Sequence, residues 1–366
     1  DLSSIDTRIN LNKKDFELIE IDYNYKEKIN ENILKYSDEE LVHLCVGDFP
    51  EAGQKNIQHI VGEAGETTSF IKEIDKYLTM VDGPAGLRIT RIYGTDDQGT
   101  FRLCFDAIND RMRYYLSPEE FAKLDLEENN KNRKGKITYQ YTTALPIGTA
   151  IAQSFNVEFA KLCGDIVGKE MDIFNIQLWL APALNIHRNV LCGRNFEYYS
   201  EDPLISGKMA GGITLGVQQH KNRGTTIKHF ACNNQEFDRL NSNSIVSERA
   251  IREIYIKGFR IAINDSNPAA LMTSYNLING THSSERKDLV TDVLRSEWKY
   301  QGLVMSDWYF SGQNDIGVSK YPPQISTNNI LAGNNLQMWG SSINYNDIMK
   351  SYKENKVTRD DLLKNA

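Results

Sequence analysis

The sequence predicts an α/β fold, specifically a (β/α)8 barrel, and three observations favour it. The chain has 366 residues, enough for a barrel of about 250 residues or for two smaller domains. Short apolar runs alternate with amphipathic helical patterns, as expected when helices join the strands of a parallel sheet. Polar residues end four of those runs, which suits a fold whose active site lies at the carboxyl ends of its strands.

Composition and charge exclude several classes of protein. Apolar residues make up 40% of the chain and charged residues 25%, which is ordinary for a globular protein and excludes a disordered or collagen-like one. With 42 basic and 49 acidic residues the net charge is −7, so we expect no nucleic-acid partner, because such proteins usually carry a basic patch. No apolar run approaches the roughly 20 residues of a membrane helix, so we expect no membrane association.

The chain divides into two expected parts. Residues 1–29 are predicted to be an edge strand or the tail of a preceding domain, because Leu11–Tyr23 alternates loosely between apolar and charged residues. Residues 30–366 are predicted to form the barrel, with a charged insertion around 93–139. The first residue is Asp1 rather than Met, which favours a processed chain or a piece of a longer protein.

Local signals predict the first elements. Ser37 and Glu40 form a capping-box pattern at a helix start, and Leu78–Val81 indicates a strand that ends in the turn Asp82-Gly83-Pro84. Inside the insertion, Ser117–Glu120 predicts another helix start, because Pro suits the first helical position.

After the insertion, short apolar runs bounded by polar or turn residues predict buried strands. These runs are Thr143–Ile147, Ile176–Leu184, Thr225–Ile227, Ala269–Tyr275, Gly302–Met305 and Asn335–Met338. Between them, Asp202 is predicted to cap a helix that starts at Pro203. Ser247 is predicted to cap an amphipathic helix that carries Ile251 and Phe259 on its apolar face.

Polar side chains stand where four predicted strands end. They are Asp82, the pair Lys228 and His229, Tyr275 and Asp307. Because the carboxyl ends of barrel strands meet at one face, we expect these side chains to converge on one site.

Asp307 at a strand end next to Trp308 is a pair that suits sugar chemistry. A carboxylate can attack or stabilise an oxocarbenium-like centre, and an indole offers an apolar platform for the face of a sugar ring. The alternative interpretation of this pair is a helix N-cap followed by a Trp of the core.

Lys228 and His229 can both donate hydrogen bonds to hydroxyl groups, and their positive field would keep a nearby carboxylate ionised. Adjacent side chains of a regular strand point to opposite faces, so we expect the backbone to bend here if both reach the site. The alternative is a purely structural role, in which His229 is buried with its hydrogen bonds satisfied and Lys228 is exposed.

Three further charged groups are ambiguous from the sequence. Arg194 offers a planar fork of donors for vicinal hydroxyls or a carboxylate, and its candidate structural partners are Glu197, Glu201 and Asp202. Asp82 can accept two hydroxyl hydrogen bonds, although Asp-Gly-Pro is also an ordinary turn. Glu236 is either a site residue or a partner for Arg239.

Motifs for several other chemistries are missing from the sequence. It contains no H-E-x-x-H, no phosphate loop G-x-x-x-x-G-K-[ST], no G-x-G-x-x-G and no G-x-S-x-G. Its six histidines are dispersed without metal-ligand spacing, so no metal site is predicted. Its five cysteines are odd in number, scattered and without C-x-x-C, which favours a reducing compartment and hence the cytoplasm.

Six segments together resemble the barrel domain of glycoside hydrolase family 3, in particular its β-glucosidase-type members. The resemblance covers roughly Asn30 to Leu363, and the segments occur in the family's order. They are Asp82-Gly83-Pro84, the stretch from Asn185 to Pro203, Lys228-His229-Phe230, Asn233-Asn234-Gln235-Glu236, Ser274-Tyr275-Asn276 and Ser306-Asp307-Trp308.

The resemblance implies exo-acting, retaining hydrolysis of a terminal β-linked glucose from a β-glucoside or short oligosaccharide, without metal or organic cofactor. It places the nucleophile at Asp307 and has Trp308 line the sugar site or its mouth. It places sugar-binding residues at Asp82, Arg194, Lys228, His229, Met272 and Tyr275. A homo-oligomer is a further possible assembly of this protein.

The family's acid/base group is not identified in this sequence. The β-glucosidase-type members take that carboxylate from a second domain, whereas the family's N-acetylglucosaminidases use a His in the loop after Lys-His-Phe. Here the corresponding loop, Asn241–Ser244, contains no His. We therefore expect the acid/base to come from outside this segment, from a β-rich domain that precedes the barrel in the permuted domain order of some members.

Two alternatives remain open at this point. Within the family, a β-xylosidase is the nearest rival, because the sequence does not fix whether a C6 hydroxymethyl group is accepted. In another class, the chain would be a non-catalytic sugar-binding barrel, although such a protein needs no nucleophile at Asp307.

Overall fold

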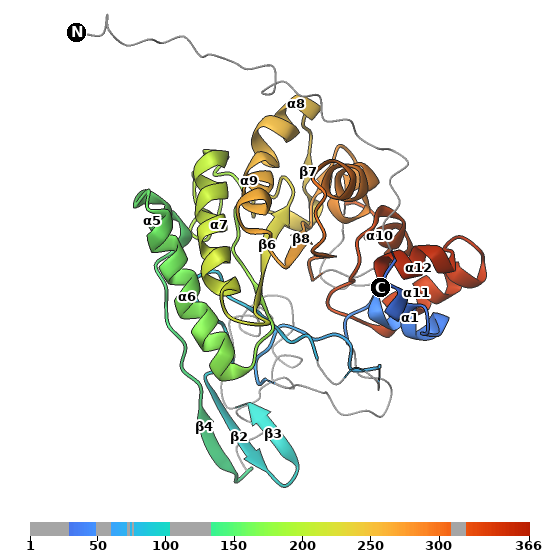
Figure 1. Cartoon of the computed structure of the whole chain (residues 1–366), viewed down its shortest axis with the longest axis horizontal. Coiled ribbons are helices and arrows are strands. Elements are labelled where there is room, and N and C mark those ends of the chain that lie inside the picture. The colour runs from blue at the N-terminus through green and yellow to red at the C-terminus, as the bar shows by residue number, and fades with distance from the viewer. Residues whose placement is uncertain (1–28, 49–59, 72–73, 75–76, 103–132, 309–319) are drawn as a thin grey trace, which may run out of the picture.

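The computed structural model describes residues 29–48, 60–71, 74, 77–102, 133–308 and 320–366 (Figure 1). The predicted helix start at Ser117–Glu120 lies outside these residues. So does the predicted N-terminal segment 1–29, except for its last residue.

A five-stranded parallel sheet with strand order β1-β5-β6-β8-β11 forms the centre of the fold. Its strands are β1 (Met80–Asp82), β5 (Leu178–Leu180), β6 (Gly224–Phe230), β8 (Ala270–Thr273) and β11 (Leu303–Met305). Each strand falls on a predicted apolar run, so the prediction of an α/β fold with a parallel sheet is confirmed. The common direction of the strands brings their carboxyl ends to one edge, where the candidate site lies.

Two predicted strands are not strands of the described structure. The prediction for Thr143–Ile147 is wrong: only an extended connection precedes α5 (Gly148–Gln153), and Pro146 within it has no N–H to offer a ladder. Asn335–Met338 forms isolated parallel bridges rather than a strand. These bridges pair Leu336 with Met305 and Gln337 with Val46.

Helices α6 (Val157–Phe174) and α7 (Pro203–Gln218) pack closely against each other beside the sheet (Figure 1). As predicted, Asp202 caps α7 by accepting a hydrogen bond from the N–H of Leu204. Glycines permit the close approach of the two helices: a Cβ on Gly164 would lie 2.1 Å from the carbonyl oxygen of Ile213, and larger residues would force the helices apart.

The chain after β6 forms a helical stretch made of α8 (Glu248–Ala250), a π-helix η5 (Ile251–Tyr255) and α9 (Lys257–Ser266). Ser247 caps this stretch as predicted, by accepting a hydrogen bond from the N–H of Ala250. Phe259 is fully buried on the predicted apolar face. A second π-helix, η7 (Asp288–Glu297), lies between β8 and β11 in the sequence.

Segments from the two ends of the described chain pack together. The helices are α1 (Asp38–Leu44), α10 (Ser326–Ala332), α11 (Ser342–Lys353) and α12 (Arg359–Asn365). Leu41, Ile348 and Leu362 belong to one buried apolar cluster that joins them. The predicted capping box of Ser37 and Glu40 starts α1, with both of its reciprocal hydrogen bonds formed.

Two small sheets complete the described fold. An antiparallel sheet of β2 (Ile92–Asp96), β3 (Gly99–Arg102) and β4 (Lys136–Tyr139) falls within or at the edge of the predicted insertion around 93–139 and projects from one end of the molecule (Figure 1). The other sheet joins three two-residue strands: β7 (Asn243–Ser244), β9 (Leu277–Ile278) and β10 (Thr281–His282). The 3-10 helices are η3 (Glu31–Ile33), η4 (Arg239–Asn241) and η6 (Ser283–Glu285).

Apolar side chains fill the space on both faces of the main sheet. One cluster packs the strands against α6, α7, α9 and η7, with Ile227 and Phe259 at 0% exposure. A second cluster brings together Met80, Met272 and Met305 from three strands of the sheet. Among the residues described, none of the helices has both the length and the apolar character needed to span a membrane.

Candidate active site

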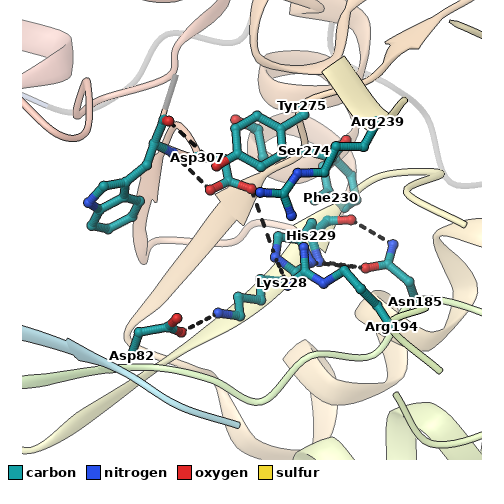
Figure 2. Close-up of polar contacts among 12 residues, drawn as sticks. Asp82, Asn185, Arg194, Lys228, His229, Phe230, Arg239, Ser274, Tyr275 and Asp307 are labelled. Atoms are coloured by element: carbon teal, nitrogen blue, oxygen red, sulfur yellow. Dashed lines mark hydrogen bonds and ion pairs between the residues drawn. The ribbon is translucent and has the colours of Figure 1, made fainter. Parts of the chain in front are cut away.

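The side chains predicted to converge come together at the carboxyl ends of the parallel strands (Figure 2). Asp82 is the last residue of β1, Lys228 and His229 belong to β6, and Tyr275 and Asp307 each stand two residues beyond the ends of β8 and β11. Arg194 reaches the same place from the long connection between β5 and α7. The structure thus brings together residues that are up to 225 positions apart in the sequence.

The backbone of β6 is irregular where its two basic side chains stand. Its pairing with β8 shifts register between Lys228 and Phe230, and the peptide bonds Lys228–His229 and Phe230–Ala231 are cis. Lys228 is directed towards Asp82 and His229 towards Arg194 (Figure 2). The predicted bend is therefore present, and both side chains are buried at the site.

Asp82 is held between two cations. The ammonium of Lys228 donates to its Oδ1 over 2.6 Å, and the guanidinium of Arg88 donates to its Oδ2 over 2.5 Å. Burial acts to raise the pKa of Asp82, but Lys228 and Arg88 together hold that pKa well below its ordinary value. Asp82 is therefore a carboxylate that accepts hydrogen bonds, and Arg88 is a site residue that the sequence reasoning missed.

Arg194 connects the loop to the histidine of β6. Its Nε donates to Oε1 of Glu197, and its Nη2 lies 3.0 Å from Nε2 of His229. Glu197 is only 5% exposed, so it acts as the buried counter-charge that the sequence allowed as one option. Burial disfavours the charge on Arg194, but Tyr198 and Glu197 lead the groups that raise its pKa well above the ordinary value.

His229 is enclosed by protein. Burial lowers the pKa of His229 well below its ordinary value, and the positive charges of Arg194, Lys228 and Arg239 lower it further. The ring is therefore neutral at physiological pH. Its backbone N–H and carbonyl both hydrogen-bond the side-chain amide of Asn185, each over 2.8 Å.

Asp307 differs from the other carboxylates at the site. Its Oδ1 accepts a hydrogen bond from the N–H of Trp308 over 2.8 Å, whereas its buried Oδ2 has no hydrogen-bond partner among the described residues and lies 3.9 Å from Nε2 of His229. Burial raises the pKa of Asp307, while Arg194 and Arg239 are the main groups that oppose this. The alternative role of Asp307 as a helix N-cap concerns residues 309–319, which lie outside the described residues.

Arg239 is a second site residue that the sequence reasoning did not select. Its guanidinium carbon lies 4.7 Å from the centre of the Tyr275 ring, and its Nη1 donates to Oε1 of Glu236 over 2.7 Å. Glu236 is thus the partner of Arg239, the second of the two options that the sequence left open. Burial is the main cause that raises the pKa of Tyr275, and the charge of Asp307 raises it further, so the phenol stays protonated.

Met272 and Trp308 lie at the edges of this group. Met272 pairs in register with Lys228 but packs into the apolar cluster between the strands. The indole N–H of Trp308 donates to the carbonyl of Ala64 over 2.9 Å, and the hydroxyl of Tyr275 lies 3.4 Å from the carbonyl oxygen of Trp308. Their predicted contacts with a sugar remain predictions.

The arrangement is a set of polar and charged side chains around one carboxylate, whose Oδ2 has no hydrogen-bond partner in the described part of the chain. Carboxylate, ammonium, guanidinium and imidazole groups can together bind a ring of hydroxyl groups, while Asp307 can react as a nucleophile. Within the described residues, His, Cys, Asp and Glu side chains form no group of three that could hold a metal ion.

Comparison with known proteins agrees with this geometry. The chain is 45% identical over 197 residues to beta-glucosidase A of Butyrivibrio fibrisolvens, a match that covers 54% of this chain and 22% of that protein. It is 40% identical over 216 residues to an exo-alpha-(1->6)-L-arabinopyranosidase of Bifidobacterium breve, which covers 59% of this chain and 27% of that protein.

Solved structures resemble the fold over nearly the whole chain. Beta-glucosidase 3B from Thermotoga neapolitana, in complex with alpha-D-glucose, superposes with a TM-score of 0.72 at 35% identity. That match covers 93% of this chain and 42% of the solved chain, so this chain spans about two fifths of that relative. The family model "Glycosyl hydrolase family 3 N terminal domain" matches residues 122–365, more than half of the chain. The chain therefore belongs to glycosyl hydrolase family 3, as part of the family's N-terminal domain.

Proposed function

We propose that this protein is a retaining, exo-acting β-glycosidase that hydrolyses terminal β-linked glucose, with Asp307 as its nucleophile. The observation that carries the proposal is the buried Oδ2 of Asp307, which has no hydrogen-bond partner among the described residues at a site otherwise full of paired charges. The similarity to beta-glucosidase A of Butyrivibrio fibrisolvens and to a glucose-bound beta-glucosidase structure supports glucose as the sugar.

Asp307 must be ionised to attack, and its surroundings balance two effects. Burial favours the neutral acid, whereas Arg194, Arg239 and Lys228 favour the carboxylate. The cations do not contact Oδ2 at hydrogen-bond distance, so they stabilise the negative charge without occupying the oxygen that would attack. Such an arrangement suits a nucleophile that must be charged and free at the same time.

The proposed reaction has two steps. In the first, Asp307 forms a bond to the anomeric carbon while the bond to the leaving oxygen breaks, and the acid gives that oxygen a proton. In the second, water bonds to the anomeric carbon as the ester to Asp307 breaks, and the conjugate base takes the proton of that water. Two displacements at one carbon retain its configuration.

The sugar hydroxyls would be bound by the paired groups around Asp307. Asp82 accepts hydrogen bonds, while Lys228 and Arg194 donate them, and neutral His229 can accept one at an unprotonated ring nitrogen. Tyr275 lies near Asp307, and its protonated hydroxyl can donate a hydrogen bond to the sugar. Met272 and Trp308 would supply apolar contacts to the ring.

We propose that the acid/base carboxylate comes from outside this segment. Three other carboxylates lie at the described site, and each is paired with a cation: Asp82 with Lys228 and Arg88, Glu197 with Arg194, and Glu236 with Arg239. Lys228 and Arg88 hold the pKa of Asp82 well below its ordinary value, and Glu197 and Glu236 are each engaged by their own cation, so none of the three suits a general acid. A β-rich domain preceding the barrel, in the permuted order, would supply it.

We also propose that the parallel sheet closes into a (β/α)8 barrel. The support is a series of backbone hydrogen bonds that leads from β11 to β1 through segments outside the named strands. These bonds run from Leu336 N to Val304 O (3.1 Å), Gln337 N to Cys45 O (2.9 Å), Asp48 N to Glu66 O (2.8 Å) and Met80 N to Gly65 O (2.8 Å).

A pentopyranosidase is the second candidate function, favoured by one observation. The Bifidobacterium breve relative at 40% identity is named as an arabinopyranosidase, and a pyranose of arabinose or xylose lacks the C6 hydroxymethyl group of glucose. A β-xylosidase belongs to the same alternative. A non-catalytic sugar-binding barrel would bind these sugars without hydrolysing them.

One experiment separates these candidates. Dinitrophenyl β-glucoside, β-xyloside and α-L-arabinopyranoside need little acid assistance, so they report on the nucleophile directly. We expect the highest kcat/KM for the β-glucoside, with β-glucose as the first anomer seen by proton NMR. A higher value for either pentoside would favour the second candidate, α-glucose as first product would contradict retention, and binding without hydrolysis would indicate a sugar-binding protein.

We propose a cytoplasmic location for the protein. Cys45, Cys163, Cys192 and Cys232 are free thiols in the described structure, which agrees with a reducing compartment. Oxidative formation of a disulfide in the protein isolated from its own cells would argue against that location.

A further inference from the structure

We propose that Asn185 is a positioning residue that fixes His229 as the neutral tautomer protonated at Nδ1, so that Nε2 carries no proton towards Asp307. Asn185 lies on the connection after β5, is 1% exposed, and meets Nδ1 of His229, whereas Arg194 meets Nε2 (Figure 2). The inference rests on the proposed function for its consequence in catalysis, but not for the tautomer itself.

The orientation of the Asn185 amide is fixed by the backbone of His229. A backbone carbonyl only accepts, so the atom 2.8 Å from His229 O must be the amide nitrogen; a backbone N–H only donates, so the atom 2.8 Å from His229 N must be the amide oxygen. The same oxygen lies 3.3 Å from Nδ1 of the ring. An oxygen that only accepts favours a proton on Nδ1.

The other ring nitrogen meets a group that only donates. Nη2 of Arg194 lies 3.0 Å from Nε2, and a guanidinium has no acceptor, so this contact also favours a lone pair on Nε2. The two neighbours of His229 therefore agree on one tautomer. The other groups around the ring are the cations Lys228 and Arg239, the carboxylate of Asp307 and the edge-on ring of Tyr198. The three surrounding cations oppose a second proton on the ring.

The consequence concerns the oxygen of Asp307 that would attack. With Nε2 unprotonated, the 3.9 Å gap between Nε2 and Oδ2 contains no hydrogen bond, and Oδ2 stays free. The opposite tautomer would direct an N–H at Oδ2, and a hydrogen bond there would weaken the carboxylate as a nucleophile. Asn185 thereby acts on Asp307 through His229, without contact to the reacting atoms.

The tautomer can be observed directly in the full chain. Long-range proton–nitrogen correlation spectra of protein labelled with 15N-histidine distinguish the two neutral tautomers from the imidazolium, and His229→Gln identifies the signal among the six histidines. We expect a neutral ring protonated at Nδ1 at pH 7. A ring protonated at Nε2, or at both nitrogens, would overturn the proposal without need of any variant.

Asn185→Ala tests whether Asn185 sets the tautomer. We expect the fraction of the Nδ1-protonated form to fall, because only Arg194 then favours it, and kcat on dinitrophenyl β-glucoside to fall about tenfold or more, with KM changed less than about twofold. Asn276→Ala is the matched control, because Asn276 is also buried and also hydrogen-bonds backbone beside β6, but the ring of His229 is not among its partners. It should leave the His229 spectrum unchanged.

An unchanged spectrum in Asn185→Ala would overturn the inference even if activity fell, because the loss would then be structural. The spectrum needs no turnover. A wild-type ring protonated at Nδ1 in a protein that hydrolyses no glycoside would therefore refute the proposed function and leave the assignment of the tautomer to Asn185 intact.

Discussion

A histidine lies near each end of strand β6, and the two rings have opposite surroundings. His220, four residues before β6 begins, places Nδ1 and Nε2 each 2.9 Å from a carboxylate oxygen, of Asp172 and Asp165 respectively. Both ring nitrogens of His220 therefore face a carboxylate. His229, at the other end, meets a donor on one nitrogen and an acceptor on the other, which suits a neutral ring.

The two ends of β6 differ in whether their charged groups are fully paired. At the amino end of β6, His220 and Arg223 join α6 to the start of the strand, and both carboxylates there contact a basic side chain. At the carboxyl end, Asp307 keeps one buried oxygen that no described residue hydrogen-bonds. We infer that the first group holds the fold, while the second retains an unsatisfied atom for substrate.

Removing the unpaired carboxylate should have the largest effect. We expect Asp307→Asn to lower kcat/KM on dinitrophenyl β-glucoside by at least about 10⁴-fold, because an amide cannot attack the anomeric carbon. Unfolding by urea, followed by circular dichroism, should show an unchanged or slightly increased stability, since burial no longer disfavours a charge. As a control, Asp265→Asn removes an acid that pairs with Lys208 on the surface. A loss below about tenfold for Asp307→Asn would contradict the role of Asp307.

Substitution of Arg194 should have the second-largest effect. Two variants separate the effect of its charge from the effect of its shape. Arg194 lowers the pKa of Asp307, so Arg194→Gln should raise that pKa and move the acidic limb of the pH–rate profile to higher pH. We expect kcat/KM to fall about 100-fold. Arg194→Lys keeps the charge, so its acidic limb should stay near that of wild type even if the rate falls. Identical limbs in both variants would show that the charge does not act on Asp307.

His220→Asn should affect stability and spare activity. The variant removes the contacts of the ring with Asp165 and Asp172, and we expect a loss of about 1–3 kcal/mol in the free energy of unfolding. Because this group lies at the opposite end of β6 from the site, kcat/KM should stay within about twofold of wild type. Arg249→Ala, which breaks an exposed ion pair with Glu253, is the control and should cost at most about 0.5 kcal/mol. A large fall in kcat/KM for His220→Asn would contradict a purely structural role of the group around His220.

The smallest expected effect is the pH dependence contributed by Asp165. Hydrogen bonds from Lys169 and His220 lead the causes that lower the pKa of Asp165 in the folded protein. A lowered folded-state pKa stabilises the protein above the ordinary value of about 3.9 and loses that effect as pH falls. Asp165→Asn should therefore cost about 1 kcal/mol at pH 7, and the difference from wild type should shrink below about pH 4. A difference that persists in acid would contradict this origin.

Much of the fold could be predicted because its signals are local. The caps at Ser37 and Asp202 depend on residues within one helical turn, and the five strands fall on runs of apolar residues. The wrong strand at Thr143–Ile147 shows the limit of this reasoning. A short apolar run indicates burial or extension, but only a neighbouring strand makes it part of a ladder.

The candidate site was partly predictable for a different reason. Asp82, Lys228 and Asp307 stand at strand ends, and parallel topology then brings them together whatever their separation in sequence. Arg88, Arg239 and Asn185 gave no such signal, because they stand outside the sheet, on connections whose course depends on the whole fold. The pairing of Glu236 with Arg239, three residues apart, was the one hint that pointed to that loop.

Trapping a glycosyl-enzyme tests most directly whether Asp307 is the nucleophile. A 2-deoxy-2-fluoro-β-glucoside with a dinitrophenyl leaving group should react once with each chain, because fluorine slows both the formation and the release of the intermediate, whereas the good leaving group speeds only its formation. We expect intact mass to increase by one fluoroglucosyl unit and peptide mapping to place it on Asp307. An adduct on another carboxylate, or no adduct while the enzyme hydrolyses dinitrophenyl β-glucoside, would contradict Asp307 as the nucleophile.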